Sequence, residues 1–256
     1  MLQTNTLKEA LAAGKSQFGC FLKFSDADSA EMIGQIGYDF CVVDAEHAAF
    51  APRELTHILR ACDLADMPCI VRTPGLNGGY ILSALDAGAA GVQVPNIDTV
   101  VQARAMVSFA KYMPEGTRGF APTTRAAGFG MGASASEYSE RANASVLTVA
   151  HCESREGAEN LDAILTVPGL DVVFVGPMDM SQSFGKVGKT GDPDVKAAIE
   201  GALARTAAAG KAPGFICGPA MVPYYRDLGV RYFLLGSDQG FMSGAARQAL
   251  EAAKKA

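Results

Sequence analysis

Short apolar runs recur along this chain of 256 residues, separated by stretches long enough to form helices. Continuous apolar segments of about four to eight residues are typical of strands buried on both faces. The predicted strands are Gly19–Lys23, Phe40–Asp44, Cys69–Arg72, Gly91–Val94, Val146–Glu153, Val172–Gly176, Ala212–Ile216 and Tyr232–Gly236. The clearest predicted helices between them are Pro52–Ala65, Asp98–Lys111, Ser154–Leu165 and Pro193–Ala209.

Strands that alternate with helices pair in parallel through right-handed crossovers. Eight such units predict a (β/α)₈ TIM barrel, and no shift in composition divides residues 1–256 into more than one domain. A barrel of this kind takes about 250 residues, which agrees with the length. The alternation alone is also compatible with an open doubly wound sheet.

Composition narrows the class of protein. With 49% hydrophobic residues, 19% charged residues and a net charge of −5, the chain is globular and has no basic surface for nucleic acid. The six cysteines lack CxxC spacing, and we expect them to be reduced, buried thiols. The first ten residues lack the basic and apolar regions of a signal peptide, and no apolar stretch is long enough to span a membrane. We therefore expect a cytoplasmic protein without a membrane partner.

Two carboxylates stand where predicted strands end. Glu153 closes Val146–Glu153, and Asp179 follows Val172–Gly176. In α/β barrels the carboxyl ends of the strands face the active site. Two hard oxygen ligands on consecutive strands can hold a divalent cation and leave its other positions open for a substrate. The alternative for Asp179 is an ordinary helix N-cap.

Three further polar residues suggest chemistry at the same end. His47 follows the second predicted strand and could act as a general acid or base. Arg72 ends the third, where a buried guanidinium requires an anion, which favours substrate binding. Asp86 precedes the fourth strand and either orients His47 or caps a helix, and the spacing does not decide between these roles.

The sequence Gly176-Pro177-Met178-Asp179 leads from a strand into a helix. Free backbone N–H groups at such a point can bind a carboxylate or a phosphate, so the metal and anion sites would be contiguous. A second feature, the Gly- and Ala-rich segment Met113–Tyr138, has the length of a binding loop, a lid or an oligomer contact. Its Arg118 and Arg125 either bind an anion or lie on the surface.

Taken together, these motifs resemble the HpcH/HpaI-type aldolase family of metal-dependent hydroxyketoacid aldolases. The resemblance is collinear over nearly the whole chain and rests on Val43-Asp44-Ala45-Glu46-His47, Val71-Arg72-Thr73-Pro74, Leu85-Asp86-Ala87-Gly88-Ala89-Ala90-Gly91-Val92, Val94-Pro95, Gly116-Thr117-Arg118-Gly119, Glu153-Ser154-Arg155-Glu156 and Phe174-Val175-Gly176-Pro177-Met178-Asp179-Met180-Ser181. It implies a (β/α)₈ barrel in a homo-oligomer, commonly a hexamer of two trimers with a helix exchanged between neighbours.

The resemblance also implies an activity: reversible retro-aldol cleavage of a 4-hydroxy-2-keto acid to pyruvate and an aldehyde through a metal-stabilised enolate. Glu153 and Asp179 match the ligands of Mg²⁺, Mn²⁺ or Co²⁺, and Arg72 matches the arginine that contacts the keto oxygen of pyruvate. His47 and Asp86 match a proton-handling pair. The pyruvate carboxylate would rest on the turn Gly176-Pro177-Met178-Asp179.

One departure from the family pattern is His151-Cys152-Glu153, where Gln-Ile-Glu or a similar triplet is expected. His151 shares a strand face with Glu153 and would reach the metal or the substrate, or support them without ligation. Lys23 is the nearest candidate for a Schiff base, which is disfavoured because no lysine lies at an obvious strand end. Alternative functions are a citrate-lyase-like acyl-CoA lyase, a related synthase, an oxaloacetate-type decarboxylase and a non-catalytic barrel that binds keto acids.

Overall fold

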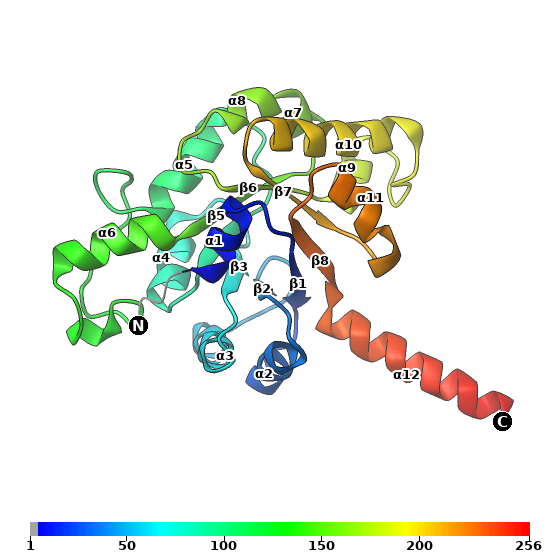
Figure 1. Cartoon of the computed structure of the whole chain (residues 1–256), viewed down its shortest axis with the longest axis horizontal. Coiled ribbons are helices and arrows are strands. Elements are labelled where there is room, and N and C mark those ends of the chain that lie inside the picture. Colours follow the sequence, from blue (N-terminus) through cyan, green and yellow to red (C-terminus); the bar gives the residue numbers. More distant parts are fainter. Residues whose placement is uncertain (1–4) are drawn as a thin grey trace.

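A computed structural model of the chain, which describes residues 5–256, shows a closed barrel of parallel strands surrounded by helices (Figure 1). Residues 1–4, part of the stretch considered above for a signal peptide, lie outside the described residues. The strands are β1 Gln17–Leu22, β2 Phe40–Asp44, β3 Cys69–Arg72, β4 Gly91–Val94, β5 Leu147–Cys152, β6 Val172–Val175, β7 Ala212–Ile216 and β8 Tyr232–Ser237. Each pairs with the next, and β8 pairs with β1, so the (β/α)₈ prediction is confirmed.

The helices fill the connections and form the outer layer. Their bounds are α1 Thr6–Ala12, α2 Ala27–Ile36, α3 Pro52–Leu64, α4 Gly78–Asp86, α5 Val100–Ala110, α6 Ala135–Ser145, α7 Arg155–Glu159, α8 Leu161–Leu165, α9 Pro177–Ser183, α10 Pro193–Ala208, α11 Val222–Asp227 and α12 Asp238–Lys255, with short 3₁₀ turns at Gly128–Gly130 and Pro219–Met221. The prediction of one helix over Ser154–Leu165 is wrong. The chain breaks at Asn160, whose side chain donates to the Asp98 carbonyl at 2.8 Å.

The inside of the barrel changes from apolar to polar along the strands. Its apolar part includes Phe40 and Tyr232, whose rings lie 4.4 Å apart, and α1 adds Leu7 to the same cluster. Near the carboxyl ends, Asp44 of β2 lies level with Arg72 of β3, which lies level with Gln93 of β4. All three are buried. Burying such groups is costly unless they bind one another or a ligand, which marks this end of the barrel as functional.

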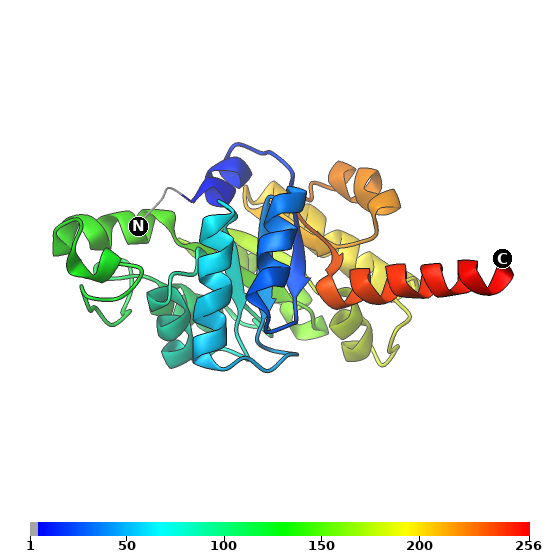
Figure 2. The same cartoon turned by 90° about the horizontal axis from the view of Figure 1, so that it is seen from below.

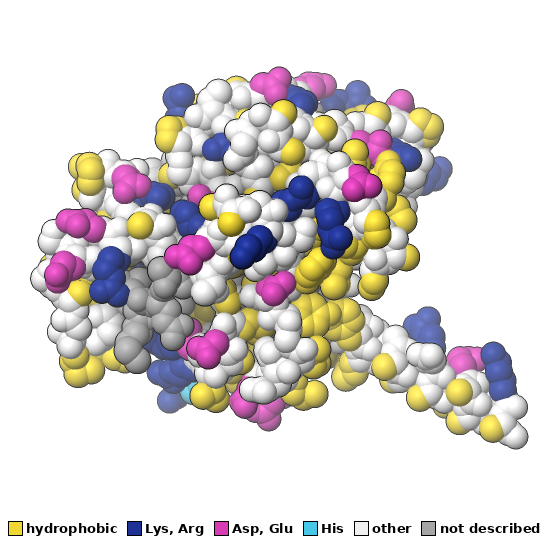
Figure 3. All heavy atoms as spheres, viewed as in Figure 1, with side chains coloured by type: hydrophobic (Ala, Val, Ile, Leu, Met, Phe, Trp, Pro, Cys, Tyr) yellow, Lys and Arg dark blue, Asp and Glu magenta, His cyan; other side chains and the backbone are white. Residues whose placement is uncertain are grey.

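Helix α12 departs from the regular outer layer. It extends away from the barrel, with the carboxyl terminus at its far end, in both Figure 1 and Figure 2. Apolar side chains of α12 are consequently exposed, among them Met242 at 60% and Leu250 at 54%. The space-filling view shows hydrophobic side chains gathered on the barrel beside the start of this helix (Figure 3). Among residues 5–256, no helix has the length and hydropathy needed to cross a membrane.

Candidate active site

Arg72 is held at the carboxyl end of the barrel by buried carboxylates. Its Nε donates to Asp44 Oδ1 at 2.8 Å, its Nη2 lies 2.6 Å from Asp44 Oδ2, and its Nη1 lies 3.1 Å from Glu46 Oε2. The guanidinium also packs over the Phe21 ring at 4.5 Å. A planar guanidinium bound on two edges has little rotational freedom, so the remaining N–H groups of Arg72 point in fixed directions.

Asp44 connects Arg72 to a second cation, because Lys23 Nζ lies 3.0 Å from Asp44 Oδ2. Burial by itself would raise the pKa of the Asp44 carboxyl, but the hydrogen bonds and charges of Arg72 and Lys23 outweigh burial and lower it. Asp44 is therefore an anion that anchors both cations. The ammonium of Lys23, the nearest Schiff-base candidate in the sequence, is committed to this ion pair.

Glu153 follows β5, and two hydrogen-bond donors hold its carboxylate in a fixed position. Its Oε1 accepts from the Asn96 amide at 2.9 Å, and its Oε2 lies 2.7 Å from His151 Nδ1. Asn96 has φ +55, a conformation that asparagine tolerates better than most residues. Burial would raise the pKa of Glu153, but His151, the Asn96 amide and Arg72 lower it overall, so the carboxylate is ionised.

His151 lies inside the barrel, only 1% exposed, and its ring packs 4.8 Å from that of Phe174. Because Glu153 is ionised, Nδ1 donates to it, and His151 Nε2 then accepts from Gln93 Nε2 at 2.7 Å. Gln93 Oε1 in turn accepts from the Tyr232 hydroxyl at 2.9 Å. Both ring nitrogens of His151 are thus engaged, an arrangement that favours the alternative in which His151 supports its neighbours without ligation; direct binding of a substrate stays a prediction.

Asp179 lies in the first turn of α9, half-buried at the same end of the barrel. The helix begins at Gly176, directly beside Glu153: a Cβ on Gly176 would come within 2.5 Å of Glu153 Oε2. Glycine at this position therefore lets the Glu153 carboxylate lie against the start of the helix that carries Asp179. Within the described residues, no side chain caps this first turn, so the amides beside Met178 and Asp179 keep their capacity to donate.

His47 and Asp86 are not brought together within one chain. His47 follows β2, its side chain is 51% exposed, and its Nε2 lies 3.7 Å from Glu46 Oε2. Asp86 ends α4, which leads into the amino end of β4, and there its Oδ1 accepts from Arg118 Nη2 at 2.7 Å. Parallel strands all run one way, so the two residues lie at opposite ends of the barrel. Asp86 does not orient His47 of the same chain.

The two arginines of the segment Met113–Tyr138 are likewise at the amino end. Arg118 is buried, pairs with Asp86 and packs over the Tyr112 ring at 4.5 Å. Arg125 pairs with Asp63 and donates to the Ala87 carbonyl at 3.0 Å. Both charges are already matched by carboxylates, and neither arginine reaches the site at the carboxyl end.

The chain is similar in sequence to known proteins over most of its length. A family model described as HpcH/HpaI aldolase/citrate lyase matches residues 17–242. The chain belongs to the HpcH/HpaI aldolase/citrate lyase family. It is 39% identical over 240 residues to a 2-keto-3-deoxy-L-rhamnonate aldolase of Klebsiella pneumoniae, which covers 93% of this chain and 88% of that protein. It is 35% identical over 236 residues to a hydroxypyruvate/pyruvate aldolase of Roseobacter denitrificans, which covers 91% of each.

Solved structures of this family agree with the fold. An HpcH/HpaI aldolase/citrate lyase family protein from Burkholderia cenocepacia matches with a TM-score of 0.93 and 34% identity, over 98% of this chain and 100% of that chain. Similarity at this level extends through every strand of the barrel. The family resemblance expected from the motifs is therefore confirmed.

Several residues of this HpcH/HpaI site were not given roles from the sequence. Asp44 and Gln93 are polar residues inside short buried strands, and that placement alone could have marked them. Glu46 belongs to the same site because its Oε2 lies 3.1 Å from Arg72 Nη1, and burial raises the pKa of its carboxyl although the charge of Arg72 opposes this. Acidic side chains at this end of the barrel include Asp44, Glu46, Glu153 and Asp179, and the cations Lys23 and Arg72 pair with the first two.

That excess of carboxylates fits a divalent cation. Glu153 is ionised and has lone pairs to spare, since each of its oxygens accepts one hydrogen bond, and both it and Asp179 offer the hard oxygen atoms such ions prefer. Gly176 leaves room on the side of Glu153 that faces α9. That Glu153 and Asp179 share one cation stays a prediction.

Proposed function

We propose that this chain is a divalent-metal-dependent pyruvate aldolase that reversibly cleaves a 4-hydroxy-2-keto acid into pyruvate and an aldehyde. The observation that carries the proposal is that the same end of the barrel holds Glu153, fixed by His151 and the Asn96 amide beside the start of α9, and Arg72, fixed by Asp44 and Glu46. A carbonyl oxygen that gains negative charge there would be stabilised by the Arg72 guanidinium and by a cation held on Glu153. The aldolase names of relatives at 35% and 39% identity support a carbon–carbon lyase.

Glu153 and Asp179 would hold Mg²⁺, Mn²⁺ or Co²⁺. Such an ion supplies Lewis-acid stabilisation of the charge that develops on pyruvate as the carbon–carbon bond breaks. Arg72 would donate to the keto oxygen with the N–H groups that Asp44 and Glu46 leave free. The turn Gly176–Asp179 would bind the pyruvate carboxylate through the amides of Met178 and Asp179.

His151 would act through Glu153 and not on the substrate. Its Nδ1–H holds one carboxylate oxygen, while Gln93 and Tyr232 hold the imidazole in that tautomer. Residues that orient a metal ligand in this way set the affinity of the site for its ion.

His47 would accept the proton of the substrate 4-hydroxyl, since it is exposed at the mouth of the barrel and tied only loosely to Glu46. A His47–Asp86 pair, as the family pattern implies, requires Asp86 from a second copy, because the two residues occupy opposite ends of one barrel. We propose a homo-oligomer, a trimer or a hexamer, in which the extended α12 packs on a neighbour. The exposed Met242 and Leu250 support this arrangement.

The decisive experiment is a pyruvate-release assay coupled to lactate dehydrogenase, run over a panel of 4-hydroxy-2-keto acids with Mg²⁺, Mn²⁺ or Co²⁺. We expect turnover of at least one substrate, its loss after chelation and its return with added metal. Glu153→Gln should remove this activity and Cys217→Ser should not. Release of pyruvate from oxaloacetate alone would instead identify a decarboxylase, and full activity after rigorous metal removal would refute the proposal.

A further inference from the structure

Three buried cysteines meet between the barrel and α3, far from the carboxylates described above. Cys41 of β2 lies level with Cys69 of β3, and Cys62 of α3 faces both from the helical layer. The Sγ atoms of Cys41 and Cys62 are 3.4 Å apart, and all three sulfur atoms lie within 4.8 Å of one another. None of the three forms a disulfide. This spacing approaches that of sulfur atoms sharing one metal ion.

The surroundings of these thiols exclude hard ligands. Cys41, Cys62 and Cys69 belong to an apolar cluster that includes Ile58 and Met67. Hydrogen bonds from Cys41 and Cys69 lower the pKa of the Cys62 thiol, with burial acting in the opposite direction. The Cys62 side-chain contact and burial raise the pKa of the Cys41 and Cys69 thiols, so the cluster offers three soft donors in an apolar site that a metal must deprotonate.

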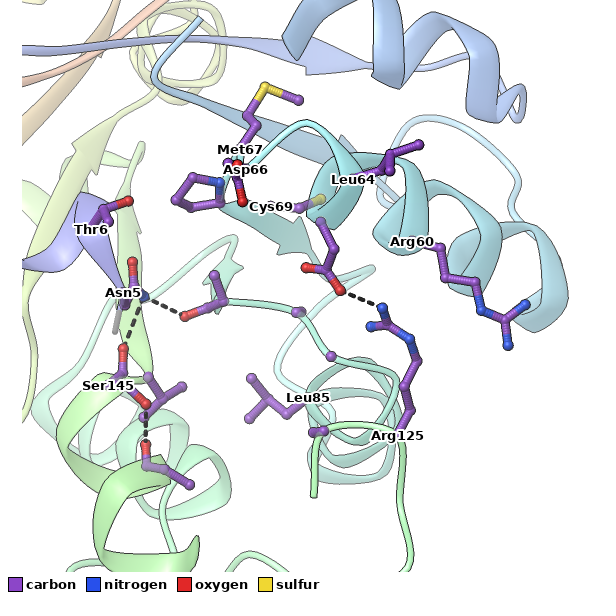
Figure 4. A pocket seen from close by; sticks show the side chains of 18 of the residues that line it. Asn5, Thr6, Arg60, Leu64, Asp66, Met67, Cys69, Leu85, Arg125 and Ser145 are labelled. Carbon is purple, nitrogen blue, oxygen red and sulfur yellow. Dashed lines mark hydrogen bonds and ion pairs between the residues drawn. The ribbon is translucent and has the colours of Figure 1, made fainter. Parts of the chain in front are cut away.

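A pocket borders the cluster at the amino end of the barrel. This pocket of about 470 Å³ lies between α3, α4 and α6, and its lining includes Cys69 and Met67 (Figure 4). Figure 4 shows these two side chains on one wall, on the segment that enters β3. Cys69 therefore belongs both to the wall of this pocket and to the cluster.

We propose that Cys41, Cys62 and Cys69 form a binding site for Cu(I), separate from the divalent-cation site of the proposed aldolase. Thiolates are soft ligands that favour Cu(I) and Zn²⁺ among the metals available to proteins. Zinc in structural sites takes four ligands, and the described residues supply three here. The single charge of Cu(I) also costs less to bury than a double charge. On binding, Cu(I) replaces thiol protons, which pass to the solvent.

The test is a competition experiment on the full-length, reduced protein under anaerobic conditions, with Mg²⁺ in excess to occupy the carboxylates. Cu(I) is supplied as its coloured complex with bathocuproine disulfonate, and the loss of colour reports transfer to the protein. We expect one equivalent to transfer. The affinity for Cu(I) should fall by roughly 100-fold or more in Cys62→Ala and in Cys69→Ala. Removing a residue that only orients a metal ligand already weakens metal binding by up to about 100-fold, and removing the ligand itself should cost at least as much.

Cys217→Ala is the matched control, because Cys217 is a half-buried cysteine outside the cluster, and it should bind as the unaltered protein does. Cu(I) should also raise the melting temperature of the unaltered protein and of Cys217→Ala, but not of the other two variants. Using two cluster variants guards against one failing to fold. Absence of transfer to the unaltered protein, or equal affinity in Cys69→Ala and Cys217→Ala, would overturn the proposal.

Discussion

Gly176→Ala tests the placement of Glu153 directly, because the nearest atoms to the added methyl group all belong to the Glu153 side chain. The new Cβ would lie 2.5 Å from Glu153 Oε2, whereas ordinary contacts begin at 3.4 Å. The carboxylate must therefore move by roughly 0.9 Å, which also stretches its hydrogen bond to His151. Gly176 has φ −86, which alanine adopts without strain, and the added Cβ would also lie 3.0 Å from the Glu153 Cβ, so the effect falls on the Glu153 side chain as a whole.

A misplacement of about 1 Å at a reacting centre can reduce the rate by about 100-fold. Disturbing the orientation of a metal ligand weakens metal binding by about 10- to 100-fold, or about 1.4 to 2.8 kcal/mol. We therefore expect Gly176→Ala to weaken Mn²⁺ binding over that range and to reduce kcat/KM in proportion. Mn²⁺ binding is measured by electron paramagnetic resonance without substrate, and kcat/KM by pyruvate release.

Gly218→Ala is the matched control. Gly218 also follows a strand, precedes a proline and starts a helical turn, with φ −68, but a Cβ there would meet nothing within 4 Å. This variant should bind Mn²⁺ and turn over as the unaltered protein does. If both alanine variants bind Mn²⁺ equally well, Glu153 is not a ligand and the steric reasoning fails.

Three more substitutions probe the same site. Arg72→Ala should lower kcat/KM by roughly 100- to 1,000-fold while Mn²⁺ binding is retained, since it removes an oxyanion contact, and near-normal turnover would exclude that role. His151→Gln should weaken Mn²⁺ binding by about 10-fold with substrate KM almost unchanged at saturating metal, and a change confined to KM would point to substrate contact instead. In urea unfolding, the stability gap between the unaltered protein and Asp44→Asn should be full above about pH 4 and shrink as pH falls further, because a lowered folded-state pKa stabilises only while the carboxyl is ionised. A difference in stability between the two proteins that stays constant from neutral pH to pH 3 would contradict the lowered pKa of Asp44.

The barrel strands follow closely from the sequence because burial on both faces leaves an unbroken apolar run. Predictions for β2, β3, β4 and β7 match the structure at both ends, and the others differ by one or two residues. The break at Asn160 was not predicted, since it depends on a hydrogen bond to the distant Asp98. The direction of α12 was not predicted. Its amphipathic pattern indicates that one face packs against another surface, but the pattern does not identify that surface.

The site was predicted less evenly than the strands. Arg72 and Glu153 could be placed because a charged residue that ends a buried strand has few alternatives. The partner of Asp86 was harder to predict. Asp86 contacts Arg118, which lies on a long connection whose path does not follow from the local sequence pattern. The link between His151 and Gln93 joins side chains 58 positions apart, and no spacing rule brings such residues together.

The hydrogen-bonded series from Tyr232 through Gln93 and His151 to Glu153 means that the electrophilic half of the site is built from the inside of the barrel. The rim is made of connections, which meet this series at Glu153 through the Asn96 amide and Gly176; other rim residues are free to vary. Exchange of rim residues can alter which aldehyde is accepted while leaving activation of the keto acid intact. New acceptor preferences, whether evolved or engineered, should therefore be sought at the rim.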